Sequence, residues 1–218
     1  MDLWPLVIAI VRPQREKTMK PFYTVDAGEF MVGSMLEKEL PGTSLWFPAK
    51  DEGDDLLLLN RDNKAFCTVQ IKVSRDYLAT HMDNFFHPHL VCCGWFTPKR
   101  SKIAESISDF WILGLHSFGH HRLSLLVIQP AELLRRYDLI HGSMERLQSY
   151  FWLTKTGKVY ETRGLSKDDQ KHIAEDKYDG SSERDFTSFL NNWSQLKTKL
   201  KAEPANAPYS SPVAGSKR

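Results

Sequence analysis

The chain has 218 residues, 41% of them hydrophobic, which suits one compact domain with appendages better than two full domains. Its 29 basic and 27 acidic side chains leave a formal charge of +2, so any nucleic-acid contact must use local basic patches. The three cysteines form no Cys-x-x-Cys pair, which argues against a zinc ribbon or a disulfide scaffold and favours a reducing, cytoplasmic setting.

The first 20 residues form a separate N-terminal segment of open status. Its apolar stretch at residues 3–11 contains Pro5 and is far shorter than the roughly 20 residues that span a bilayer. The segment also lacks the basic leader and the cleavage site of a secretory signal. We therefore expect neither a membrane span nor export. The change in character after Lys20 suggests that Met19 is the natural start.

Residues 21–140 are the predicted core, and the core begins with a helix over 26–40. Apolar side chains recur at helical spacing from Phe30 to Leu36, and Pro41 follows as a stop signal. This pattern predicts a helix with one buried face.

Three strands are predicted next. The short aromatic run at 44–47 indicates an edge strand, and the four leucines at 56–59 suit a strand buried on both faces. A polar turn then leads to a strand over 65–75, which makes a hairpin with the leucine strand.

Side chains alternate along the strand at 65–75. The apolar side chains at positions 67, 69, 71 and 73 face the core, whereas Thr68, Gln70, Lys72 and Ser74 face the other way. Such a polar face is either solvated or lines a site.

A loop rich in His, Pro and Gly is expected before residue 101. It is followed by a short helix at 101–108, strands at 109–115 and 123–128, and a helix that starts at Pro130. This order indicates an α/β domain with a mixed sheet.

The remaining residues, 141–201, are predicted to form a C-terminal extension. A polar hairpin is expected at 150–161, and residues 184–200 show an apolar stripe at helical spacing. The stripe either packs back on the core or binds a partner, including a second copy. Residues 202–218 have the composition of a disordered tail.

One set of polar residues has the chemistry to hydrolyse a phosphodiester. Mg²⁺ prefers oxygen ligands, and Asp55 precedes the leucine strand while Gln70 and Lys72 share one face of its neighbour. The amide oxygen of Gln70 and the carbonyl of Ile71 are suitable ligands, and the Lys72 ammonium suits the attacking water or the scissile phosphate. Glu29 on the first helix is placed to complete the site.

The order of these residues resembles that of the PD-(D/E)XK nuclease superfamily, in particular its restriction-endonuclease-like and Holliday-junction-resolvase-like branches. The matching segments, within residues 26–136, are Gly28-Glu29, Gly53-Asp54-Asp55-Leu56-Leu57, Val69-Gln70-Ile71-Lys72-Val73-Ser74, Ser108-Asp109-Phe110-Trp111-Ile112-Leu113 and Val127-Ile128-Gln129-Pro130-Ala131-Glu132-Leu133. The resemblance implies a restriction-endonuclease-like α/β fold: a mixed central sheet flanked by helices, here with a helical C-terminal extension.

The resemblance also implies roles for the site residues. Asp55 is the expected central metal ligand, Glu29 the helix carboxylate, Gln70 the second strand ligand and Lys72 the catalytic cation. Mg²⁺ is the expected metal, with Mn²⁺ able to substitute. The implied activity is an endonuclease that cuts DNA and leaves 5′-phosphates, in bacterial or phage defence, restriction or repair, as a homodimer or in a larger complex. Two features depart from the family pattern: Gln70 replaces the usual carboxylate, and no proline precedes the aspartate.

Basic and aromatic residues near the core suggest a DNA contact. Lys99, Arg100 and Lys102 form a basic cluster that can neutralise phosphates or simply solubilise the surface. Trp95 and Phe96 beside it either stack on bases or belong to the core.

Two alternatives to the nuclease reading stay open. The chain can be a catalytically inactive nuclease-like domain that binds nucleic acid, or a protein partner through residues 184–200. The histidine pairs His87/His89 and His120/His121 are compatible with a metal but lack the spacing of a known site.

Overall fold

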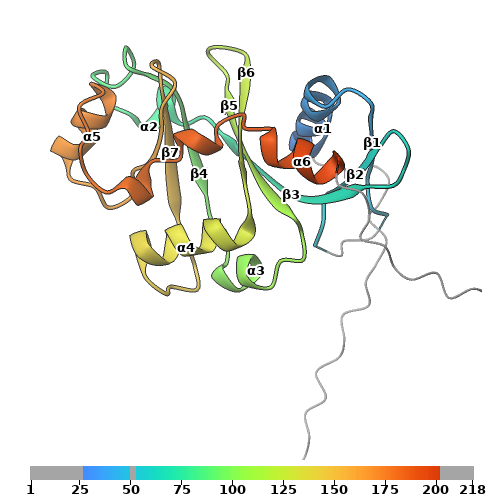
Figure 1. The fold of residues 1–218 in the computed structure, drawn as a ribbon. Helices are drawn as coiled ribbons and strands as arrows, with labels where there is room; N and C mark the ends of the chain where they lie inside the picture. The colour runs from blue at the N-terminus through green and yellow to red at the C-terminus, as the bar shows by residue number, and fades with distance from the viewer. Residues whose placement is uncertain (1–26, 50–52, 202–218) are drawn as a thin grey trace, which may run out of the picture.

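The computed structural model describes residues 27–49 and 53–201, which form two β-sheets with helices packed against them (Figure 1). The predictions for residues 1–20 and 202–218, including the start at Met19, lie outside the described residues. Within the described ranges, no helix is long and apolar enough to cross a membrane.

The larger sheet has five strands in the order β1-β2-β3-β5-β6. The strands are β1 (Thr43–Trp46), β2 (Leu56–Asn60), β3 (Phe66–Arg75), β5 (Phe110–Ser117) and β6 (Arg122–Ile128). Neighbours are antiparallel except β3 and β5, which run parallel. The predicted α/β class with a mixed sheet is confirmed, and β1 is an edge strand as expected.

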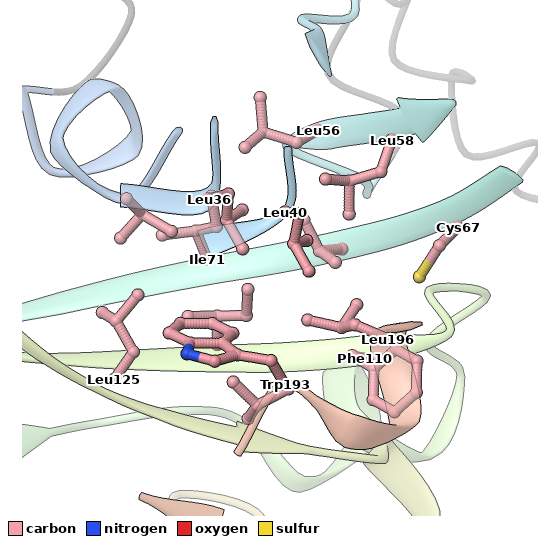
Figure 2. Close-up of a cluster of buried hydrophobic side chains, with 14 of the residues drawn as sticks. Leu36, Leu40, Leu56, Leu58, Cys67, Ile71, Phe110, Leu125, Trp193 and Leu196 are labelled. Carbon is pink, nitrogen blue, oxygen red and sulfur yellow. The ribbon is translucent and has the colours of Figure 1, made fainter. Parts of the chain in front are cut away.

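Helices α1 (Ala27–Glu39) and α6 (Ser194–Lys201) cover one face of this sheet. Figure 2 shows Leu36 of α1 and Leu196 of α6 in one apolar cluster with Leu58 and Ile71 of the strands. The expectation that the leucine strand is buried on both faces is wrong. Leu56 and Leu58 are fully buried, but Leu57 and Leu59 are partly exposed, because β2 lies near the sheet edge and is covered on one side.

A second, three-stranded sheet has the order β4-β7-β8, all antiparallel. Its strands are β4 (Leu90–Phe96), β7 (Ser149–Thr154) and β8 (Val159–Glu161), and the helices nearby are α2 (Leu78–His81), α3 (Arg100–Ala104), α4 (Pro130–His141) and α5 (Lys167–Ala174). Side chains of β4 and β7 pack with α4 on the face of β5 and β6 that points away from α1 and α6.

Two sequence-based expectations fail at this second sheet. The loop rich in His, Pro and Gly contains α2 and β4. The apolar run of β4 is hidden in the sequence by Gly94 within it and by Pro88 and Pro98 on either side. The hairpin expected to be polar is β7–β8, and its residues are almost all buried between layers. Because β4 pairs with β7, the predicted boundary between core and extension at residue 140 runs through one sheet.

The single amphipathic helix predicted over 184–200 is also not formed. Two short 3-10 helices, Ser182–Arg184 and Thr187–Phe189, precede α6. This segment packs first against the second sheet and then against the first. Phe186 is buried beside the second sheet, whereas Trp193 and Leu196 are buried against the first. The stripe therefore packs back on the core, and its role as a free partner-binding helix is wrong.

Candidate active site

Asp55 lies where the pairing between β2 and β3 ends. Its backbone N–H donates to the carbonyl of Val69 at 2.9 Å, which continues the ladder by one residue. Two residues further along β3, the N–H of Ile71 donates to the Asp55 carboxylate at 2.7 Å. Only 5% of Asp55 is exposed, and the bond from Ile71 holds its carboxylate oxygen in a defined position at the end of the strand pair.

Gln70 and Lys72 meet this carboxylate from the polar face of β3. The Gln70 amide donates to Asp55 Oδ2, and Lys72 Nζ lies 3.6 Å from the same oxygen. Lys72 Nζ also donates to the carbonyl of Ile71 at 2.8 Å, and half of its side chain is exposed. The structure thus brings together Asp55, Gln70, Ile71 and Lys72, and the ammonium stays within reach of a ligand from solvent.

These groups form a sparse but chemically suitable donor set for Mg²⁺. The ion commonly binds one or two carboxylates, retains several waters and takes further oxygens from substrate phosphates. Gln70 now presents its N–H to Asp55, so a half-turn of the amide is needed for its oxygen to join an ion bound there. In the described ranges no group of three or more His, Cys, Asp or Glu side chains is able to hold a metal.

Glu29 occupies the first turn of α1 and is half-buried. Helix α1 packs against β3 on the face opposite Gln70 and Lys72, since its apolar residues join Ile71 in the first cluster. The approach of Glu29 to the Asp55 carboxylate stays a prediction.

A polar network that the sequence did not reveal fixes the strands that carry the site. Thr68 and Asp109 bond reciprocally: Thr68 N donates to Asp109 Oδ2 at 3.0 Å, and Asp109 N donates to Thr68 Oγ1 at 3.2 Å. Lys199 of α6 pairs with Asp109 at 2.9 Å, and this contact raises the Lys199 pKa. The hydroxyl of Ser108 donates to Asp54. The parallel start of β3 and β5 is thereby held beside Asp55.

A pocket of about 320 Å³ opens next to Lys72. Trp111 of β5 and Phe96 of β4 form part of its wall, and Lys99 and Lys102 add positive charge at the same hollow. Register pairing places Trp111 beside Gln70 and Leu113 beside Lys72, so the pocket continues the polar face of β3.

The three basic residues predicted to contact DNA are not equivalent. Lys99 and Lys102 line the pocket, whereas Arg100 forms a bidentate pair with Asp138 of α4 at 2.7 and 2.8 Å. Hydrogen bonding to Asp138 raises the pKa of Arg100 and lowers that of Asp138, so this pair joins α3 to α4.

The two neighbouring aromatic residues also differ. Trp95 is 53% exposed, while Phe96 is buried in the second cluster because successive strand residues face opposite ways. Of the two, Trp95 is the residue exposed to solvent.

Comparison of the chain with models of protein families, with curated proteins and with solved structures gave no match. The function must therefore be inferred from the residues and their geometry.

Proposed function

We propose that this chain is a Mg²⁺-dependent DNA endonuclease of the PD-(D/E)XK type. The observation that carries the proposal is the convergence of a buried carboxylate, an amide and an ammonium on one point at the end of two paired strands. Gln70 and Lys72 lie 15 and 17 positions after Asp55 in the sequence, yet all three side chains meet there. The pocket beside them carries further lysines.

Each residue has a distinct task in this proposal. Asp55 would hold the ion, with Ile71 O and the Gln70 amide oxygen as further ligands. When bound, the ion would make the attacking water more acidic and would offset negative charge on the phosphoryl oxygens. Lys72 keeps N–H donors besides the one given to Ile71, and these can hold the attacking water or the scissile phosphate.

The neighbouring lysines support a polyanionic substrate. Lys99 and Lys102 lie at the same pocket as Lys72. Lysines that neutralise phosphates release the counterions of DNA, so the affinity for DNA should fall as the salt concentration rises. At a net charge of +2, such a local cluster is the feature that attracts DNA.

The restriction-endonuclease-like fold is part of the proposal. In its support, the site lies on an antiparallel hairpin, β2–β3, that continues into a parallel neighbour, β5, with α1 packed behind it. Cutting both strands of a duplex requires two sites, for which a homodimer or a larger defence or repair complex is the proposed setting.

A binding function without catalysis is the second candidate. It is favoured by the amide at position 70, because a neutral ligand holds Mg²⁺ less strongly than a carboxylate. In that case the lysine pocket binds nucleic acid and no strand is cut.

A cleavage assay with matched lysine variants separates these functions. Supercoiled, linear and single-stranded DNA are incubated with the full chain, with Mg²⁺, with Mn²⁺ or with EDTA. We expect metal-dependent cutting that Lys72→Ala reduces about 100- to 1,000-fold, the usual effect of removing one electrostatic donor. Lys158→Ala is the control, because Lys158 is similarly exposed and is also paired with an aspartate, but belongs to the β7–β8 hairpin. Binding of DNA without cutting in either metal contradicts the nuclease and supports the second candidate.

A further inference from the structure

A second pocket, of about 350 Å³, is walled by aromatic rings and belongs to the smaller sheet. Tyr77 contributes from the segment before α2, Trp95 from β4, and Tyr150 and Trp152 from β7. A volume in this range matches pockets that take small ligands, and such sites are mostly apolar with a few polar groups. The site described above does not use this pocket.

The aromatic wall is held in place by its own contacts. Trp95 and Tyr150 are cross-strand partners whose ring centres lie 6.3 Å apart, and Tyr77 meets Tyr150 edge-on at 6.0 Å. The indole N–H of Trp152 donates to the Tyr77 hydroxyl at 2.9 Å. Burial raises the pKa of Tyr77, which keeps its hydroxyl neutral. The rings are therefore preorganised and need little rearrangement to accept a flat ligand.

Trp95 lines both this pocket and the lysine pocket beside Lys72. The exposed indole of Trp95 therefore joins the pocket of Lys72, Lys99 and Lys102 to the aromatic pocket. A nucleotide has the same two parts, a phosphate and a planar ring, joined within one residue.

We propose that the aromatic pocket takes an unpaired nucleobase of the strand whose phosphates lie at Lys72, Lys99 and Lys102. The proposal rests on the proposed function for the position of those phosphates. Stacking on aromatic rings suits every unpaired base, because each base has a π face.

The polar groups at the pocket agree with a heteroaromatic ring. His81, Thr162 and Gln170 line it together with the rings. The Thr162 hydroxyl donates to the carbonyl of Tyr150 and can accept from a base edge, and Gln170 keeps one N–H besides the one given to Leu165. None of the eight lining residues carries a carboxylate. Ring faces also attract a quaternary ammonium ion, and no carboxylate is present to balance its charge, so tetramethylammonium serves below as the competing occupant.

The test measures how much of the binding depends on the bases. Fluorescence anisotropy of the full chain in EDTA, where no cutting occurs, compares an oligothymidylate with an abasic strand of equal length and charge. Stacking of one base is worth about 1–3 kcal/mol, so we expect the abasic strand to bind about 5- to 140-fold more weakly.

The variants locate that difference. Trp95→Ala should lose affinity for oligothymidylate and no longer distinguish the two strands, and Tyr150→Ala should behave alike. Trp46→Ala is the control, since Trp46 is a comparably exposed tryptophan on the edge strand β1. Lys72→Ala should weaken both strands equally, because it acts on phosphates.

Several results overturn the base pocket. The first is equal affinity of the wild-type chain for oligothymidylate and for the abasic strand. The second is a Trp95→Ala protein that still distinguishes the two strands as the wild type does. The third is tetramethylammonium chloride weakening oligothymidylate binding more than NaCl does at the same ionic strength. Base-dependent binding without any metal-dependent cutting supports the pocket and contradicts the nuclease. Cutting without base dependence contradicts the pocket alone.

Discussion

Replacing Asp55 with asparagine keeps the size and shape of the side chain but removes its charge. The amide oxygen of Asp55→Asn can still accept from the backbone N–H of Ile71, which is now bonded at 2.7 Å. A charge-assisted bond becomes a neutral one, which costs about 1–1.5 kcal/mol. The pair with half-exposed Lys72 adds at most about 1 kcal/mol.

The change in stability should therefore be modest and the change in function large. A loss of about 1–2.5 kcal/mol lowers the melting temperature by roughly 2–10 °C in a chain of this size. An ion at one hundred times its dissociation constant stabilises the protein that binds it by about 2.7 kcal/mol, or roughly 5–11 °C. Asp55→Asn should lose that stabilisation together with cleavage.

Thermal unfolding with increasing Mn²⁺ or Mg²⁺, followed in parallel with cleavage, measures both effects. Asp176→Asn is the control, because Asp176 also pairs with a lysine, Lys158 at 2.6 Å, but away from the site. An Asp55→Asn protein that is stabilised by Mn²⁺ and cuts DNA like the wild type would refute the role assigned to this carboxylate.

Three further predictions concern the stability of the second sheet and of helix α4. Glu161 is fully buried and pairs with the partly buried Arg184 at 2.7 Å, so Glu161→Ala removes the carboxylate that balances this cation and should cost about 3–5 kcal/mol in urea unfolding; a loss below about 1 kcal/mol contradicts this. Hydrogen bonding to Arg135 lowers the pKa of Glu132 from 4.5 to about 2, so its stabilisation is present above pH 4.5 and is lost as pH falls towards 2. Across that range, the unfolding midpoint of Glu132→Gln should fall less steeply with pH than that of the wild type. Parallel curves for the two proteins would argue against this role of Glu132. In Gly94→Ala the added Cβ overlaps the buried side chain of Leu115, and we expect a loss of about 1–3 kcal/mol by calorimetry, whereas an unchanged protein would show that Leu115 moves freely.

The large sheet and the approach of three site residues were predictable from the sequence because they depend on local patterns. Alternation along β3 put Gln70 and Lys72 on one face, and a hairpin turn of a few residues brought Asp55 back to them. Strand period and short connections act over neighbouring residues, so the sequence alone expresses them.

The tertiary structure alone decided which surfaces those elements meet. More than fifty residues separate β4 from its partner β7. No local pattern in the His-, Pro- and Gly-rich segment around β4 predicts that the two strands pair. The engagement of Arg100 by Asp138, the burial of Phe186 and the placement of Trp95 between two pockets all depend on contacts between distant segments. Periodicity tells which face of an element is apolar, but the partner of that face is chosen by packing of the whole chain.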